Sequence, residues 1–225
     1  MYTEEFAPFN YMGPDGSVTG SSTEGVQEIL DRLGEKGKID LVSWSEGYRR
    51  TIATPGTAQF STARTAEREP LFLWVGPIGS NDMVFLARNG SGLRIDSLEA
   101  AQKTGVIGVV QDDARHQFLQ ENNISNVATF PIDETTVKAL MHGDIALWFG
   151  GSVTAPGSLI KAGYSTADVE MLYRVKTVDL YISFNNRTAP GRVAAWQKTL
   201  DDMKKDGTYD AIRARYFVQG VPSAS

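Results

Sequence analysis

Short apolar strands and amphipathic helices alternate along this 225-residue chain, and this alternation constrains the fold more than any other feature. Strands are predicted at 58–63, 106–111, 127–130 and 145–149, and helices at 97–103, 113–122 and 133–142. A strand–helix–strand succession favours parallel pairing, because the helix returns the chain to the edge where the next strand begins. The sequence therefore predicts an α/β protein with mostly parallel sheets.

The first and last long helices have recognisable ends. Ser21 and Glu24 have the spacing of a capping box, and Gly34 is a typical C-terminal stop. The last long helix is predicted at 190–206, with an apolar face. Residues 89–92, Asn-Gly-Ser-Gly, interrupt the pattern of elements and predict a point where the chain crosses between two lobes.

Composition argues against several classes of function. The net charge of -5 and the lack of a Lys/Arg cluster argue against nucleic-acid binding and fit a soluble monomer. The chain has no cysteine, so disulfides, thiolate nucleophiles and cysteine metal sites are absent. His116 and His142 lie far apart without ligand spacing, and neither belongs to a Ser-His-Asp motif. We therefore predict no metal, no cofactor and no catalytic residue.

Arg68 is the clearest candidate for a binding residue. It follows the predicted strand 58–63 within the sequence Thr-Ala-Glu-Arg-Glu, just before an aromatic-rich segment. A guanidinium can hold a carboxylate through two parallel hydrogen bonds. The alternative is an ordinary surface arginine near the end of a strand.

Four segments carry a resemblance to a known family. They are Phe6-Ala7-Pro8-Phe9 with Gly20 after it, the stretch 60–78 around Arg68, the strand and helix at 109–122, and the closing pattern Trp196, Gly207-Thr208-Tyr209 and Ile212. In this order they resemble the family 3 extracellular solute-binding proteins that feed amino-acid ABC transporters. The resemblance covers nearly the whole chain.

The resemblance implies a two-lobed, type II periplasmic-binding-protein fold that closes on its ligand by a hinge. Lobe 1 would comprise residues 1–87 plus 179–225, and lobe 2 residues 88–178. In open α/β sheets, ligands lie beyond the carboxyl ends of the strands. The resemblance also implies that a signal peptide has been removed, and that the protein is periplasmic or extracellular.

In lobe 1, the resemblance implies that Arg68 holds a ligand carboxylate, helped by Ser61 and by the backbone N–H of Ala63. Phe6 matches a pocket aromatic of the family, and Trp44 lies in a segment that resembles a lobe-one loop. Both aromatic side chains could equally be core residues.

In lobe 2, the residues Asp113, Ala114 and Arg115 begin a predicted helix whose free N–H groups suit an anion. The alternative is that Asp113 is simply an N-cap. Arg115 could reach a second acidic group of a ligand. The family has an aspartate for the ligand ammonium where this chain has Gly151, so we expect extra room there. Either another group replaces that aspartate, with Asp113 the best candidate, or the ligand is not a standard α-amino acid.

The expected function is capture of a small carboxylate-bearing solute, an amino acid or a related acid, and its delivery to an ABC permease. This is a binding role rather than an enzymatic one. Two alternatives stay open on the same fold. One is a ligand-sensing module of a signalling system, and the other is an enzyme similar to cyclohexadienyl dehydratases.

Overall fold

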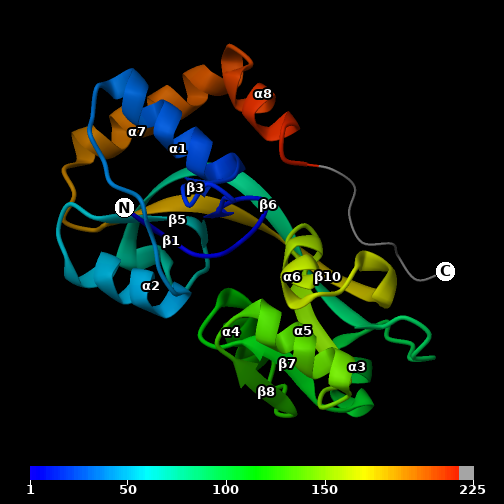
Figure 1. Ribbon diagram of the computed structural model, residues 1–225. Helices are drawn as coiled ribbons and strands as arrows, with labels where there is room; N and C mark the ends of the chain where they lie inside the picture. The colour runs from blue at the N-terminus through cyan, green and yellow to red at the C-terminus, as the bar shows by residue number, and fades with distance from the viewer. Residues whose placement is uncertain (218–225) are drawn as a thin grey trace. The chain divides into compact units, whose positions relative to one another are not determined.

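The computed structural model describes residues 1–217 of the chain (Figure 1). These residues form two compact units. Unit 1 contains Met1–Ser80 together with the described residues from Asp179 onward, and unit 2 contains Asn81–Val178. None of the helices in this part of the chain combines the length and the apolar character that crossing a membrane requires.

The chain passes between the units within two long strands, β6 (Phe72–Arg88) and β10 (Val169–Asn185). The first passage is at Ser80/Asn81, whereas the sequence placed it after residue 87; the second is at Val178/Asp179. The crossing that we predicted at residues 89–92 is not there, because this loop lies inside unit 2. Gly90 and Gly92 have φ of 73° and 71°, so the two glycines form a turn after β6 ends.

Hydrogen-bonded neighbours in the sheet are in the order β4-β1-β5-β10-β6-β9-β7-β8. In unit 1, β1 (Tyr2–Thr3) pairs in parallel with β4 (Asp40–Leu41) and β5 (Ala58–Ala63), and β10 pairs antiparallel with β5. A hairpin of β2 (Tyr11–Met12) and β3 (Val18–Thr19) precedes the first helix. A single turn of 3₁₀ helix, η1 (Glu69–Leu71), precedes β6.

Helices cover both faces of the unit 1 sheet. They are α1 (Ser21–Leu33), α7 (Pro190–Lys205) and α8 (Thr208–Ala214), which pack together, and α2 (Trp44–Ala53), which lies against β1 and β5 (Figure 1). Side chains alternate along β5: Ala58 and Phe60 join the apolar core that α1 and α7 cover, while Gln59 faces Gly47 of α2. A Cβ at Gly47 would lie 3.2 Å from Gln59, so this glycine allows the close approach of α2.

In unit 2, β7 (Ile107–Val110) pairs in parallel with β8 (Val127–Phe130) and β9 (Leu147–Gly151), and β6 pairs antiparallel with β9. The helices are α3 (Leu98–Thr104), α4 (Ala114–Glu121), α5 (Asp133–His142) and α6 (Ala155–Ala162), with a 3₁₀ turn, η2 (Thr166–Asp168). Met83 and Phe85 belong to one buried cluster and Val84 and Leu86 to another. The unit 2 portion of β6 is therefore buried on both faces, as its continuous apolar sequence requires.

The predicted α/β class with mostly parallel pairing is confirmed. The predicted capping box of the first helix is wrong. Gly20 is the N-cap residue with φ of 117°, Ser21 is already in the helix, and no side chain caps the helix. The C-terminal stop at Gly34 is confirmed, because this residue has the left-handed conformation, and its N–H and the next one donate to the last carbonyls.

Candidate functional site

Five of the predicted residues come from the segments at the carboxyl ends of the parallel strands of unit 1. Because β1, β4 and β5 run in parallel, their carboxyl ends share one edge of the sheet. Phe6 follows β1, Trp44 follows β4, and Ser61 and Ala63 end β5, with Arg68 in the loop after it.

Arg68 is buried, with 1% of its surface exposed. Its Nη1 donates to the carbonyl oxygen of Ala63 at 3.3 Å. Its guanidinium carbon lies 4.6 Å from the ring centre of Trp44 and 5.4 Å from that of Tyr48. Ring faces attract a cation without bearing a formal charge, and the attraction grows when water is excluded. Burial raises the pKa of the Tyr48 hydroxyl, and the nearby Arg68 opposes this rise.

The resemblance put Trp44 in a loop, but Trp44 is the first residue of α2. Ser43 caps this helix by accepting a hydrogen bond from the N–H of Glu46. The helix places Tyr48 one turn after Trp44, with the two ring centres 5.5 Å apart. Trp44 is buried, and the helix is what sets its ring beside the guanidinium of Arg68.

Phe6 and Ser61 are joined to the loop after β1 through Asn10. Phe6 is half-buried and stacks on Phe9, with ring centres 5.6 Å apart. Ser61 has φ of 61°, close to the point where the pairing of β5 with β10 shifts register. Its hydroxyl donates to Oδ1 of Asn10, whose Nδ2 donates to the carbonyl oxygen of Glu4 at 2.6 Å. Asn10 is fully buried, and nothing in its sequence context pointed to this contact.

The predicted residues of unit 2 also lie at the carboxyl ends of parallel strands: Asp113, Ala114 and Arg115 come after β7, and Gly151 is the last residue of β9. Asp113 is the N-cap of α4 and accepts from the N–H groups of Arg115 at 2.7 Å and His116 at 2.9 Å. The expectation that these N–H groups are free for an anion is therefore wrong. A carboxylate of the chain itself already occupies them. Ala114 begins the helix and is half-buried.

Arg115 lies between two carboxylates. It donates from Nε to Asp113 at 2.6 Å, and from Nη1 and Nη2 to the two oxygens of Asp133 at 3.0 Å each. Trp148 donates from Nε1 to Asp133 at 2.9 Å. Burial lowers the pKa of Arg115, but the Coulombic attraction of Asp113 and Asp133 outweighs burial and raises the pKa above its ordinary value. The acidic group that Arg115 reaches is thus Asp133, which is not among the predicted site residues.

Gly151, at the end of β9, has no spare room beside it. A Cβ there would lie 2.1 Å from Nδ2 of Asn81 and 2.5 Å from Oγ1 of Thr154. Asn81 is held by two hydrogen bonds, from its Nδ2 to Thr154 at 3.2 Å and from the N–H of Val153 to its Oδ1 at 2.9 Å. The expected extra space at Gly151 is therefore wrong, because the amide of Asn81 fills it.

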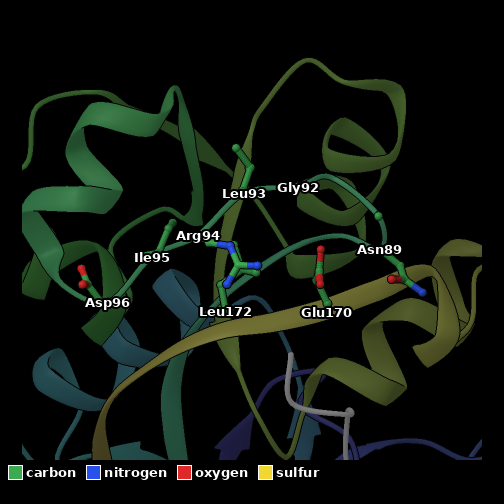
Figure 2. Close-up of a pocket in the computed structure, with 9 residues that line it drawn as sticks. Asn89, Gly92, Leu93, Arg94, Ile95, Asp96, Glu170 and Leu172 are labelled. Carbon is green, nitrogen blue, oxygen red and sulfur yellow. The ribbon is translucent and has the colours of Figure 1, made fainter. Parts of the chain in front are cut away.

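Unit 2 also has an open pocket of about 660 Å³ at the opposite edge of its sheet, where β6 ends and β10 begins (Figure 2). Leu93, Arg94 and Ile95 come from the loop after β6, and Glu170 and Leu172 come from β10. None of the predicted binding residues lines this pocket. Within residues 1–217, no three His, Cys, Asp or Glu side chains gather as a metal site would require.

Solved structures similar to this chain come from proteins with different roles. An ABC uptake transporter substrate-binding protein from Streptococcus pneumoniae with bound histidine is 15% identical, with a TM-score of 0.85 over 99% of this chain and 94% of that one. A histidine kinase sensor domain similar to periplasmic binding proteins is 16% identical, with a TM-score of 0.88 over 98% and 96%. The ancestral amino-acid-binding protein AncCDT-1, a precursor of cyclohexadienyl dehydratase, is 17% identical, with a TM-score of 0.81 over 97% and 95%.

At these identities the similarity shows a shared fold. No curated protein sequence matches the chain. The family of bacterial extracellular solute-binding proteins, family 3, matches residues 1–219. The match spans both units and nearly the whole sequence, so the chain belongs to the bacterial extracellular solute-binding proteins of family 3.

Proposed function

We propose that this protein is an extracytoplasmic binding protein that captures a small carboxylate-bearing solute and delivers it to an ABC permease. It works as a monomer in the periplasm or outside the cell, closes on its ligand by a hinge, and does no chemistry on it. The observation that carries the proposal is the buried Arg68, whose guanidinium lies over two aromatic rings at the carboxyl edge of the unit 1 sheet.

A guanidinium in that position suits a carboxylate for two reasons. The rings of Trp44 and Tyr48 hold the guanidinium in place by their faces, and a buried cation attracts an anion more strongly than an exposed one. Arg68 is 1% exposed, so a ligand reaches it only after a covering group has moved. That requirement fits a protein that opens and closes around its solute.

The ligand class extends beyond standard α-amino acids. Gly151 offers no carboxylate for a ligand ammonium, and Asp113 is bonded to Arg115 and to two backbone N–H groups. An ammonium buried without a negative partner is costly. Acids without an amino group, and diacids, therefore belong in the search beside the amino acids.

A thermal-shift screen of amino acids, diacids and aromatic acids, followed by calorimetry, tests the proposal. Arg68→Ala should weaken binding of the best ligand by about 2–4 kcal/mol, because a charge-assisted pair in a dehydrated site is lost. Arg68→Lys should also bind poorly, since an ammonium cannot reproduce the two parallel bonds. Arg49→Ala, at an exposed position of α2, is the matched control. Unchanged affinity in Arg68→Ala would exclude the anchoring role.

A sensory role is the second candidate, and the likeness to a histidine kinase sensor domain favours it. Ligand binding alone does not separate sensing from transport. Uptake of the identified ligand by cells that lack this gene separates the two roles. If the protein serves transport, uptake is lost. If it serves sensing, the transcriptional response to the ligand is lost and uptake is intact. Incubation with prephenate or arogenate tests the enzymatic alternative. Turnover of either compound would show that the protein is an enzyme and would overturn the binding proposal.

A further inference from the structure

The loop between β5 and β6 carries Arg68, and its two ends are joined through their side chains. Arg64 donates from Nε and Nη2 to the two carboxylate oxygens of Glu69, each at 2.6 Å. The Arg64 guanidinium also lies over the rings of Trp74 and Tyr181, at 5.6 and 5.3 Å from their centres. Arg64 therefore ties this loop to β6 and β10 as well as to Glu69.

The backbone of the same loop forms a turn around Thr65. Its carbonyl oxygen accepts from the N–H of Arg68 at 3.1 Å and from that of Glu69 at 2.9 Å. Trp74 adds a third tie from β6, because its Nε1 donates to the carbonyl oxygen of Glu69 at 3.3 Å. Arg68 thus precedes Glu69, which is fixed through both its side chain and its carbonyl oxygen.

The Arg64–Glu69 pair is exposed, whereas Arg68, which lies between them in the loop, is buried. The side chain of Arg64 is 39% exposed and that of Glu69 50%, whereas Arg68 is 1% exposed. Ion pairs at such exposure contribute little to global stability. They can still narrow the conformations of a short loop, and ordering a site before binding saves entropy that binding would otherwise cost.

We propose that Arg64 is a positioning residue that holds the 64–69 loop closed, so that the Arg68 guanidinium lies over Trp44 and Tyr48 before a ligand arrives. The affinity part of this proposal rests on the proposed function. The positioning part does not, because it concerns the ligand-free protein.

NMR of the arginine Nε–H groups in the ligand-free protein tests the positioning part. Stacking over Trp44 should displace the Arg68 signal from the ordinary arginine range, and the signal is assigned by its loss in Arg68→Lys. Arg64→Gln should move this signal back toward the ordinary range. Glu69→Gln, which keeps Arg64 beside its two rings, should move it less. The control is Lys198→Gln, which removes one positive charge from an exposed pair with Asp202 on α7.

Calorimetry with the L-amino acids and dicarboxylic acids of the panel tests the affinity part. Arg64→Gln should weaken binding about tenfold, a loss comparable to that of one surface ion pair and two ring contacts, and should lower the melting temperature by only about 2–4 °C. Arg64 has no positioning role if the Arg68 signal of Arg64→Gln lies where it lies in Lys198→Gln and the affinity of Arg64→Gln changes less than about twofold. If no acid binds even the unmodified protein, the proposed function fails, while the NMR comparison still decides the positioning role.

Discussion

Each unit buries one arginine at the carboxyl edge of its parallel strands, and the two arginines have opposite surroundings. Arg68 of unit 1 lies over Trp44 and Tyr48 and donates to a backbone carbonyl. Arg115 of unit 2 lies between the carboxylates of Asp113 and Asp133. The exposed fractions are similar, 1% for Arg68 and 7% for Arg115, so burial does not distinguish them.

This difference underlies our proposal that the same residue type serves binding in one place and structure in the other. Two carboxylates outweigh the single charge of Arg115, and the bonds from Nε, Nη1 and Nη2 use the donors that a ligand would need. The aromatic rings of Trp44 and Tyr48 contact Arg68 by their faces rather than through carboxylates. In the proposed function, unit 1 attracts the anionic ligand through Arg68, whereas Arg115 stabilises unit 2 locally.

The largest effect that follows from this comparison is on the stability of unit 2. Asp133→Asn removes the charge that pairs with Nη1 and Nη2 of Arg115, and disturbs the acceptor of Trp148. We expect the free energy of unfolding to fall by about 3 kcal/mol, because the buried charge of Arg115 loses one of its two carboxylate partners. Urea unfolding measures this loss, and the exposed Asp144→Asn serves as control. A loss below about 1 kcal/mol would mean that Asp113 alone satisfies Arg115.

A smaller loss should follow from placing a carboxylate at the edge of unit 2. Gly151→Asp puts a Cβ into the amide of Asn81 and breaks the hydrogen bonds of that amide to Thr154 and Val153. We expect a loss of about 2 kcal/mol, near 1 kcal/mol for each bond. Gly151→Asp should therefore fail to improve amino-acid binding, although the family resemblance implies an aspartate at this position.

The double variant Asn81→Ala/Gly151→Asp tests the cause of that loss. Removing the amide clears the space, so the additional effect of Gly151→Asp should be smaller in the Asn81→Ala background, as measured by urea unfolding. If the two substitutions are additive instead, the clash with Asn81 is not what excludes a side chain at this position.

The fold was predictable because its signals are local in sequence. The strands β5 and β8 and the helix α5 have the bounds that their apolar patterns predicted. The helix α2 was missed, because Gly47 in its middle weakens the helical pattern. Only the folded structure shows why a glycine is suitable there: a larger residue would meet Gln59 and Tyr2.

The candidate site was predictable in outline, since strand ends predict where binding residues gather, but its contacts were not. Asn81 meets Thr154 across 73 positions of sequence, and Ser61 meets Asn10 across 51. Neither pair has a local pattern, so Gly151 was interpreted as an empty place. Asp133 is the intermediate case: it begins a predicted helix after a predicted strand, next to the strand that leads to Asp113. Parallel pairing of those strands could have placed the two carboxylates together.

The smallest expected effect concerns a third arginine, at the surface of unit 1. Hydrogen bonds from Thr208 and from the guanidinium of Arg32 lower the pKa of Asp206 to about 2. A lowered pKa stabilises the fold above the unfolded-state value of 3.8, and this contribution is lost as the pH falls through about 2. Asp206→Asn should therefore lower the urea midpoint at pH 5 and lose less stability than the unmodified protein as the pH falls from 5 to 3. Asp210→Asn, an exposed carboxylate of α8, is the control, and it should follow the unmodified protein. Parallel pH profiles for Asp206→Asn and the unmodified protein would show that Arg32, exposed at 30% of its side chain, holds no measurable charge interaction, unlike Arg115.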